Sequence, residues 1–383
     1  MTERDPVVGM VGGGQLARMT YQAAIGPGIG MRVMAAAPGE SAAKICADTV
    51  LGDHRSLDDL RGFADGCDVL TFDHEHVPQE HLRALESAGV RVRPGPDALL
   101  YAQDKLAMRE RLSALGMPCP AYAKVGSAGD VTAFAEAHAW PVVVKAVRGG
   151  YDGRGVWLCA DEDAAAEVCA EAAAHGVELI AEEHVRFRRE LAVLVARSPH
   201  KQGAVYPVVE TVQEDGICVE VLAPAPGLDP DRAAEAQRVA LDIAGELGVV
   251  GLLAVEMFET DDGVLINELA MRPHNSGHWT IEGARTSQFE QHLRAVLDLP
   301  LGATRLAAPH IVMANVLGGT DPDVYGRYVH VMAHDPGLRV HMYGKGVRPG
   351  RKIGHVTVLG DDLPGLRARA RDAADYLRWG EDR

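Results

Sequence analysis

A glycine-rich segment near the middle of the chain has the composition of a loop that binds phosphate groups. Its four glycines lie within residues 149–155, between apolar runs at residues 142–144 and 156–159, and Lys145 ends the first run. Glycine lets a backbone come close to anionic oxygens, and exposed N–H groups suit phosphate. Because no Gly-Lys-Ser/Thr sequence opens a helix here, the segment predicts a strand–loop–strand cover over phosphates rather than a Walker loop. A plain glycine-rich hairpin would show the same pattern.

Two glutamates further along the chain could hold a metal ion. Glu256 belongs to an apolar run at residues 252–258, and Glu268 follows a second run at residues 264–267, after an Asp-Asp-Gly turn. A hairpin with this turn can set both carboxylates side by side on one face of a sheet, with the Asn267 oxygen beside them. Carboxylate and phosphate oxygens are typical ligands of Mg²⁺. The alternative is a solvated pair at a sheet edge, which the apolar neighbours make less favourable.

A dense polar run, Arg-Pro-His-Asn-Ser-Gly-His, follows directly at residues 272–278. Arg272 can bind an anion through two N–H groups, and Asn275 and Ser276 can donate hydrogen bonds to oxygens. His274 could donate a hydrogen bond or move a proton. We therefore expect an anionic intermediate beside the metal and phosphate site.

The N-terminal sequence Gly-Gly-Gly-Gln-Leu-Ala at residues 12–17 fits the dinucleotide fingerprint after a strand. The next strand-like run, at residues 32–36, ends without the Asp or Glu that would bind an adenosine ribose, so NAD is not expected. A smaller ligand could still place its phosphate at the N-terminus of the following helix. A tight turn with no ligand is the remaining alternative.

The overall composition excludes several classes of protein. The chain has 383 residues and a formal net charge of −16, so a nucleic acid is not expected as a partner. Against this charge, the basic run at residues 345–352 is either a phosphate clamp or a solvated loop. The six cysteines show no metal-binding spacing, and no signal-peptide core or membrane-spanning apolar run is visible. We therefore expect a cytoplasmic protein with reduced thiols.

The elements that must position these residues follow an α/β order. Strand-like and helix-like runs alternate from the start, which predicts a parallel sheet with helices on its faces. A strand-rich segment with interspersed helices follows, and from about residue 300 short β-type runs precede a closing helix. These runs are expected at residues 310–316, 328–333, 338–343 and 352–359, and the helix at 363–377. We expect three domains, at residues 1–104, 105–300 and 301–383.

These motifs together resemble the ATP-grasp ligases, and within them the N5-carboxyaminoimidazole ribonucleotide synthetases of purine biosynthesis. The resemblance extends over nearly the whole chain, and its most specific marks are the middle glycine motif and the His-Asn-Ser-Gly-His run. It implies an α/β chain with an N-terminal Rossmann-like βαβ domain, a central two-lobed ATP-grasp domain and a small C-terminal α+β domain. Further matching segments lie at residues 12–16, 72–77, 267–269 and 348–355.

The resemblance also implies a reaction. ATP, with Mg²⁺, would phosphorylate bicarbonate to carboxyphosphate, and this intermediate or the CO₂ that it releases would carboxylate the exocyclic amine of 5-aminoimidazole ribonucleotide. The products would be the N5-carbamate, ADP and phosphate. Two anions must meet in this reaction, so cationic groups are needed to neutralise their charge. Carboxyphosphate reacts with water, which gives a closing glycine loop a purpose.

Roles are carried over from the resemblance residue by residue. The groups expected around bicarbonate and carboxyphosphate, as catalytic residues, are Arg272, His274, Asn275 and Lys352. The expected ATP contacts are Lys105, Lys145, Gly150, Tyr151, Asp152, Gly153, Arg154, Gly155, Glu182, Glu183, His184, Val185, Glu190, Gln213, Asn267 and Glu268. The expected contacts to the imidazole nucleotide are Gly14, Gln15, Glu75, Tyr151, Asp152, Arg154, Ser276, Lys345 and Arg351. The expected Mg²⁺ ligands are Glu256 and Glu268.

Three positions depart from the pattern of the resembled family. Gln213 stands where a histidine is expected near the nucleotide, although an amide can still donate a hydrogen bond. Ala17 replaces a glycine in the first turn, and Met271 replaces a proline before Arg272. None of the three touches the expected metal or carboxylation site.

Other functions compete with this interpretation. A different ATP-grasp ligase would share Lys145, Glu256 and Glu268, whereas a biotin-dependent carboxylase is disfavoured because no Met-Lys-Met site is present. A catalytically silent nucleotide-binding protein and an NAD-dependent oxidoreductase are the alternatives from other classes. The resemblance further implies a homodimer and a downstream mutase that takes up the carbamate, although no docking motif is visible.

Overall fold

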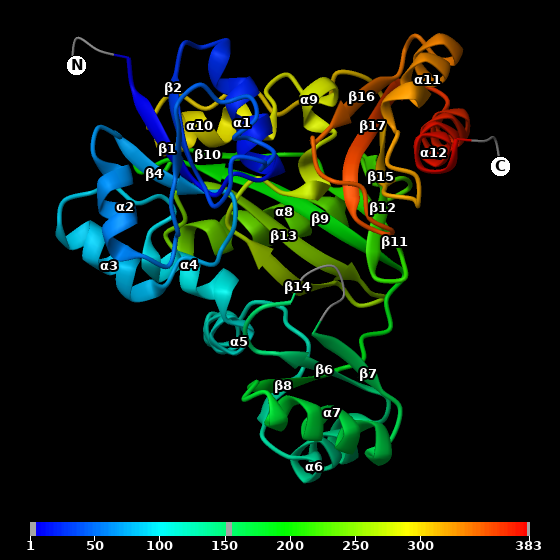
Figure 1. Ribbon diagram of the computed structural model, residues 1–383. Helices are drawn as coiled ribbons and strands as arrows, with labels where there is room; N and C mark the ends of the chain where they lie inside the picture. Colours follow the sequence, from blue (N-terminus) through cyan, green and yellow to red (C-terminus); the bar gives the residue numbers. More distant parts are fainter. Residues whose placement is uncertain (1–4, 151–154, 381–383) are drawn as a thin grey trace.

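The computed structural model describes residues 5–150 and 155–380, and its strands form three sheets (Figure 1). The N-terminal sheet is parallel, with the strand order β3-β2-β1-β4. Its strands are β1 (Val7–Val11), β2 (Gly30–Ala35), β3 (Thr49–Leu51) and β4 (Val69–Phe72). The helices that accompany it are α1 (Gln15–Ile25), α2 (Leu57–Ala64), α3 (Gln79–Ser87) and α4 (Pro96–Gln103). This is the βαβ arrangement that the alternating sequence pattern predicts.

Alternation along β1 explains how helices cover both faces of this sheet. Val8 and Met10 pack into one apolar cluster with Ala17 of α1, whereas Val11 packs into another with Phe63 of α2. Successive residues of a strand point to opposite faces, so α1 lies on one face and α2 with α3 on the other. Because β1 and β4 are parallel, the polar residues that follow them emerge at the same edge of the sheet.

The central sheet has nine strands in the order β14-β13-β9-β11-β12-β15-β17-β16, with β10 paired to β9. Its strands are β9 (Arg189–Arg197), β10 (Gly203–Val205), β11 (Val209–Glu214), β12 (Ile217–Ala223), β13 (Gly251–Glu259), β14 (Val264–Ala270), β15 (His310–Leu317), β16 (Arg339–Met342) and β17 (Lys352–Gly360). Strand β15 pairs antiparallel with β12, so the C-terminal strands extend the central sheet rather than forming one of their own. The C-terminal helix α12 (Leu363–Trp379) packs against β15 and β17.

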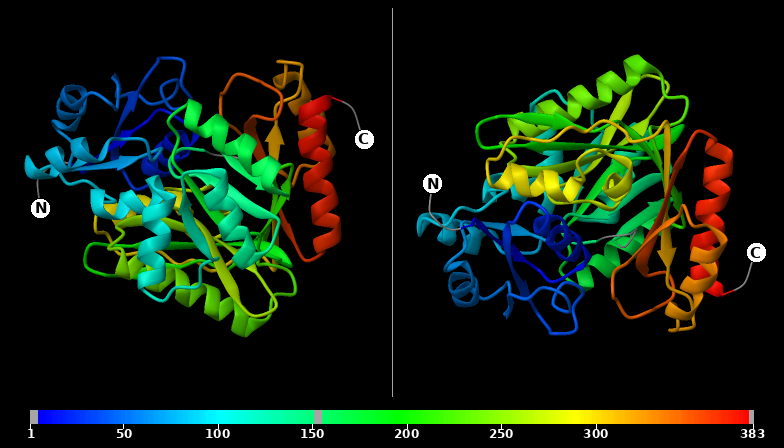
Figure 2. Two further views of the ribbon diagram at one scale, coloured as in Figure 1. Left: turned by 90° about the horizontal axis from the view of Figure 1, so that it is seen from below. Right: turned by 90° about the horizontal axis from the view of Figure 1, so that it is seen from above.

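Helices cover both faces of the central sheet as well. Helix α8 (Pro230–Glu246) packs its apolar residues on one face, and α10 (Gln288–Val296) lies on the other. Leu293 and Val296 of α10 also enter the apolar cluster of the N-terminal sheet, so this helix joins the two sheets. The two views in Figure 2 show the N-terminal part and α12 on opposite sides of the molecule. Short helical turns η1 (Asn275–Gly277) and α9 (Thr280–Gly283) connect β14 to α10.

A smaller lobe projects from this body and lies at the bottom of Figure 1. Its antiparallel sheet has the order β5-β8-β6-β7, formed by β5 (Tyr122–Val125), β6 (Val142–Ala146), β7 (Val156–Cys159) and β8 (Leu179–Glu183). Helices α6 (Ala128–His138) and α7 (Glu162–Ala174) pack on this sheet. The helix α5 (Lys105–Ala114) leads into the lobe, and residues 184–188 lead out of it to β9. The predicted strand–loop–strand of the glycine segment is therefore β6 and β7, which pair antiparallel.

One predicted strand is wrong. Residues 328–333 were expected to be a β-type run, but α11 (Tyr328–His334) is a helix that follows the short turn η2 (Tyr325–Arg327). The alternation of apolar and polar residues there does not reflect a half-buried strand, since Val331 is the one buried residue of the helix and Val329 is 76% exposed. His330 stacks on Tyr376 of α12, so a contact across the fold overrides the local β preference. Among the described residues, no helix combines the length and apolar character needed to cross a membrane.

Candidate active site

Glu256 and Glu268 face each other across the pair of strands β13 and β14. The register shifts by one residue after Glu256, where the pairing passes from Glu268 to Ile266 and leaves Asn267 as the extra residue of a β-bulge. The Asn267 amide oxygen accepts a hydrogen bond from Lys145 of β6 at 3.1 Å. The structure thus brings together the two carboxylates and the lysine of the glycine segment, as the sequence predicts.

The pKa values of the two carboxyl groups are shifted in opposite directions. Burial, Glu268 and Glu190 raise the pKa of Glu256 to about 7. Burial also acts against ionisation of Glu268, yet its pKa is lowered because Lys105 donates to its Oε1 at 2.8 Å. Both side chains still reach solvent, at 29% and 43% exposure. In the part of the chain that the structure describes, no group of three or more His, Cys, Asp or Glu side chains forms a metal site, so the pair can supply only part of a coordination shell.

Glu182 occupies the junction between the small lobe and the body. Its two carboxylate oxygens each pair with a cation at 2.7 Å, Oε2 with Lys145 and Oε1 with Arg109. Burial would raise the pKa of Glu182, but these two cations outweigh it and hold the pKa at about 2. Because both oxygens are engaged, a nucleotide base at this segment would meet backbone groups rather than this carboxylate.

Arg109 is a site residue that the sequence did not reveal. It is completely buried, and beyond Glu182 it donates to the carbonyl oxygens of Ile266 and Asn267, both at 2.8 Å. One guanidinium therefore links α5, the small lobe and the bulge that carries Asn267. Nothing in the pattern of helix α5 marks Arg109 as buried, because its partners come from distant strands.

The remaining residues expected near the nucleotide lie along the exit from the small lobe. Glu183 accepts a hydrogen bond from the Ala121 N–H at 2.9 Å, while His184 is exposed. Val185 is half-buried in the same loop. Burial raises the pKa of Glu190 on β9, against the effect of a hydrogen bond from the Gln213 side chain. Gln213 therefore reaches Glu190 although it stands where a histidine was expected.

The glycine segment is described only in part. Gly150 and Gly155 have φ angles of 83° and 73°, in the left-handed region that favours glycine. The Gly155 carbonyl accepts a hydrogen bond from Ala146, which closes the base of the loop. The predicted contacts Tyr151, Asp152, Gly153 and Arg154 lie outside the described residues.

The side-chain carboxyl of Asp73 lies against the first turn of the N-terminal sheet. Asp73, which follows β4, accepts hydrogen bonds from the backbone N–H groups of Gly14 at 2.6 Å and Ala17 at 2.8 Å. Its carboxylate occupies the N-terminus of α1, a position that suits an anion. A phosphate at Gly14 would share or displace this contact. Asp73 belongs to the matching segment at residues 72–77, but no role was predicted for it from the sequence.

Residues from both ends of the chain meet beside this turn. The Lys345 ammonium donates to the Gln15 amide oxygen, and Lys44 donates to the Gly344 carbonyl at 2.6 Å. Glu75 accepts from the Met271 N–H at 2.8 Å, and its other oxygen lies 3.5 Å from Nε of Arg272. Of the residues expected to bind the imidazole nucleotide, Gln15 and Lys345 thus meet directly, and Glu75 lies against the central part of the chain at Met271 and Arg272. Arg351 is exposed and donates to the Gly346 carbonyl at 3.1 Å.

The polar run after β14 reaches the Glu256 carboxylate through His274. Nε2 of His274 lies 3.6 Å from Oε1 of Glu256, and its Nδ1 lies 2.9 Å from Oγ of Ser276. Burial lowers the pKa of His274 to about 3, and the nearby charges of Arg272 and Lys352 add to this effect. His274 is therefore a neutral imidazole near pH 7, which can form hydrogen bonds but carries no charge.

Asn275 is oriented by a partner that the sequence did not indicate. Its amide exchanges two hydrogen bonds with Asn315 of β15, at 2.9 and 2.8 Å. Asn315 also donates to the Cys218 carbonyl on β12 at 2.8 Å, so the strands of the central sheet fix it in turn. This pair occupies one acceptor and one donor of Asn275 and leaves a second amide hydrogen for a ligand.

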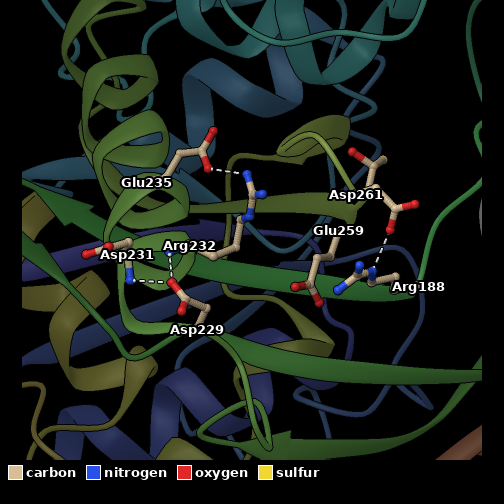
Figure 3. Close-up of a pocket in the computed structure, with 8 residues that line it drawn as sticks. Arg188, Asp229, Asp231, Arg232, Glu235, Glu259 and Asp261 are labelled. Atoms are coloured by element: carbon tan, nitrogen blue, oxygen red, sulfur yellow. Dashed lines mark hydrogen bonds and ion pairs between the residues drawn. The ribbon is translucent and has the colours of Figure 1, made fainter.

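A separate hollow of about 320 Å³ lies at the turn between β13 and β14 and the start of α8 (Figure 3). Arg188 and Asp261 pair across it at 2.6 Å, and Arg232 and Glu235 pair at 2.7 Å. The other lining residues are Asp229, Asp231, Glu259 and Thr260. None of the predicted site residues lines it, and of its other acidic groups Glu259 pairs with Arg189 outside the hollow and Asp229 accepts from the N–H groups of Asp231 and Arg232.

The parallel N-terminal sheet, the two lobes, and the contacts of Lys105 with Glu268 and of Lys145 with Asn267 define the class: the chain is an ATP-grasp ligase. Its sequence matches the ATP-grasp domain family over residues 110–289, the ribonucleotide synthetase preATP-grasp domain over 6–103, and the phosphoribosylaminoimidazole carboxylase C-terminal domain over 311–369. Within this class, the chain belongs to the N5-carboxyaminoimidazole ribonucleotide synthase family.

Relatives support this assignment over nearly the full length. The N5-carboxyaminoimidazole ribonucleotide synthase of Mycobacterium tuberculosis is 57% identical over 379 residues, 98% of this chain and 88% of the relative. A crystal structure of the synthetase from Thermus thermophilus is 36% identical with a TM-score of 0.86, covering 97% of this chain and 98% of that one. A structure of the Aspergillus clavatus enzyme in complex with ADP and 5-aminoimidazole ribonucleotide is 32% identical with a TM-score of 0.88, covering 97% and 98%.

Proposed function

We propose that the corner formed by Glu256 and Glu268 is where this enzyme brings ATP and bicarbonate together. The chain catalyses the ATP-dependent carboxylation of 5-aminoimidazole ribonucleotide to N5-carboxyaminoimidazole ribonucleotide, the reaction of its family in purine biosynthesis. The observation that carries the placement is the cross-strand pairing of the two glutamates beside Lys105 and Lys145.

The donor chemistry of this corner fits Mg²⁺. Two facing carboxylates, with phosphate oxygens and water completing the shell, match the preference of this hard cation. The raised pKa of Glu256, about 7, reflects a carboxylate crowded by burial and by Glu268, a state that a nearby dication would relieve. When bound, Mg²⁺ would neutralise charge on the ATP phosphates. Lys105 and Lys145 would contact the same phosphates from the side of the small lobe.

The polar run would hold the second anion. Arg272 would bind bicarbonate and then carboxyphosphate, which is formed when the γ-phosphoryl group passes to a bicarbonate oxygen and ADP leaves. His274 would orient these groups by hydrogen bonding as a neutral imidazole, since its pKa is about 3. Asn275, fixed by Asn315, would donate to an oxygen, and Lys352 would add positive charge.

The imidazole nucleotide would bind between the two ends of the chain. Glu75 lies on the loop after β4, Gln15 is the first residue of α1, and Lys345 approaches from the C-terminal part. This supports the proposed set of nucleotide contacts. The members of the set are Gly14, Gln15, Glu75, Tyr151, Asp152, Arg154, Ser276, Lys345 and Arg351. The amine of the nucleotide would then meet the carboxyl donor near Arg272, which is 3.5 Å from Glu75.

We further propose four features, of which the family resemblance implies the homodimer and the mutase, and composition and sequence pattern predict the location and the domains. The chain would form a homodimer, reside in the cytoplasm and pass its unstable product to a mutase. It would be organised into domains at residues 1–104, 105–300 and 301–383, although the strands of the last domain continue the central sheet.

The test is the dependence of ADP formation on each substrate. With Mg²⁺-ATP, we expect ADP release to require bicarbonate and to be accelerated by 5-aminoimidazole ribonucleotide, with one carbamate formed for each ADP. ADP release that ignores the imidazole nucleotide would contradict the proposed activity. Substrates of other ATP-grasp ligases, added in place of the imidazole nucleotide, serve as controls.

A further inference from the structure

Gln288, the first residue of α10, is a completely buried amide that holds the backbone of His274 at two points. Its Oε1 accepts a hydrogen bond from the His274 N–H at 2.8 Å, and its Nε2 donates to the His274 carbonyl at 2.8 Å. The Gln288 backbone is itself held, because its N–H donates to Oγ1 of Thr280 at 2.8 Å. The Gln288 side chain thus bonds to both the N–H and the carbonyl of His274, as a neighbouring strand would.

The orientation of this amide is fixed by the backbone groups that it meets. A backbone N–H can only donate and a carbonyl can only accept, so Oε1 and Nε2 of Gln288 cannot be exchanged. Nε2 also lies 2.9 Å from Nδ1 of His278, which must therefore accept a hydrogen bond. His278 is consequently a neutral imidazole with its proton on Nε2, in agreement with a pKa that burial lowers well below the usual value.

The glycine of the polar run makes room for this contact. A Cβ atom added at Gly277 would lie 2.5 Å from Oε1 of Gln288 and 2.5 Å from Cδ1 of Leu194. Any larger residue at position 277 would push the amide away from His274. The sequence His-Asn-Ser-Gly-His therefore contains both His274, which Gln288 holds, and Gly277, which leaves room for the Gln288 amide.

We propose that Gln288 is a positioning residue for the transfer site, acting through His274. This inference rests on the proposed role of His274 beside Glu256. The clamp fixes the peptide from which the imidazole extends, and the ring then spans Oε1 of Glu256 at 3.6 Å and Oγ of Ser276 at 2.9 Å. A misplacement of about 1 Å at a reacting site can cost about 10²-fold in rate.

The same helix provides a matched control. Gln291 is also completely buried, and it clamps Gly302 in the same way: the Gly302 N–H donates to its Oε1 at 2.7 Å, and its Nε2 donates to the Gly302 carbonyl at 2.8 Å. Gly302 is not part of the proposed site. Loss of either clamp removes two backbone contacts, but only the loss at Gln288 affects the proposed transfer site.

The experiment compares Gln288→Met with Gln291→Met in the full chain, by thermal unfolding and by steady-state ADP formation with all three substrates. We expect a decrease in Tm for both variants, at least as large for Gln288→Met because this change also removes the donor to Nδ1 of His278. Only Gln288→Met should lower kcat, by about 10²-fold, with KM for ATP changed by less than about twofold because the proposed ATP contacts are untouched. Equal kcat values in the two variants would overturn the inference.

Two further variants test the positioning role of Gln288 separately from the proposed role of His274. Gln288→Glu keeps the side-chain volume and the acceptor for the His274 N–H but removes the donor, so it should fold and still lose kcat. His274→Ala tests the proposed role of His274 directly. If His274→Ala retains the wild-type kcat, the proposed role of His274 fails and the positioning inference fails with it. If His274→Ala is impaired while both Gln288 variants match Gln291→Met, only the positioning inference fails.

Discussion

Glu256 of β13 and Glu268 of β14 are direct cross-strand neighbours, yet the pKa of the first is raised to about 7 and that of the second is lowered. Burial acts on both, so the difference comes mainly from Lys105, whose charge and hydrogen bond both favour the ionised form of Glu268. Near pH 7, Lys105 therefore balances the charge of the ionised Glu268, whereas Glu256 is only partly ionised. Such a corner is poised to accept a divalent cation.

Removing the charge of Glu268 should impair turnover while leaving the fold intact. We expect Glu268→Gln to lower kcat with Mg²⁺-ATP by at least about 10²-fold, because a carboxylate that would hold the cation becomes a neutral amide. The control is Glu178→Gln, since Glu178 pairs with Lys124 at 2.7 Å on the exterior of the small lobe. Mg²⁺ titrations of ADP formation measure both variants, and a near-normal rate for Glu268→Gln would remove it from the metal site.

The raised pKa of Glu256 predicts how stability depends on pH in the absence of divalent cations. The pKa of the carboxyl is near its ordinary value of 4.5 in the unfolded chain and about 7 in the folded protein, so the folded state binds more protons between these values. The contribution of Glu256 to the free energy of unfolding therefore falls as pH rises from about 4.5 to about 7.

The variant Glu256→Gln isolates this contribution, because a neutral amide resembles the protonated carboxyl. At pH 5 the wild-type protein and Glu256→Gln should have similar free energies of unfolding in EDTA. At pH 8 the variant should be more stable by about 1–3 kcal/mol, a figure reduced by the solvent that reaches this side chain. Denaturant unfolding at the two pH values measures this difference, and a constant difference across the range would contradict it.

The pairing of Glu256 with Glu268 was predictable because two apolar runs and one tight turn encode it locally. The partners of Arg109, Asn275 and His274 were not, since Glu182, Asn315 and Gln288 come from elements whose packing no single run specifies. The same limit explains the error at α11, where the stacking of His330 on α12 outweighs a strand-like pattern. Patterns with periods of two or 3.6 residues report which face is buried, but they do not report which charged or amide group that face will meet.

Arg272 should act mainly after phosphoryl transfer, because its proposed partner is the anionic intermediate. We expect Arg272→Ala to lower kcat strongly and to change KM for ATP little. Its contact with Glu75, 3.5 Å away, is not needed for folding, since Glu75 keeps the hydrogen bond from the Met271 N–H. Steady-state kinetics with varied ATP test this, and a raised KM with unchanged kcat would assign Arg272 to the nucleotide instead.

Arg109 should be a determinant of stability as well as of the site. Arg109→Met leaves the buried Glu182 carboxylate with Lys145 alone and removes the donors to two carbonyls of β14, so we expect a loss of about 3–5 kcal/mol in the free energy of unfolding. Arg109→Lys should recover only part of this loss, because one ammonium cannot span three acceptors in the planar geometry of a guanidinium. Denaturant unfolding measures both variants, and a loss below about 1 kcal/mol for Arg109→Met would contradict the role.

His292 should make the junction of the two sheets sensitive to acid. It is completely buried on α10, its Nδ1 accepts from the Leu252 N–H at 3.1 Å, and its Nε2 therefore donates to Oγ1 of Thr71 at 2.7 Å. Burial lowers its pKa to about 3, whereas the pKa of the imidazole in the unfolded chain is near its ordinary value of 6.5. Below pH 6.5 the unfolded state binds the extra proton, so the stability that His292 contributes is lost progressively as pH falls.

Between pH 7.5 and pH 5 this loss should be about 2 kcal/mol. His292→Gln should be less stable at pH 7.5 but should lose less stability over the same range, and parallel pH profiles for the two proteins would show that His292 does not titrate in this way.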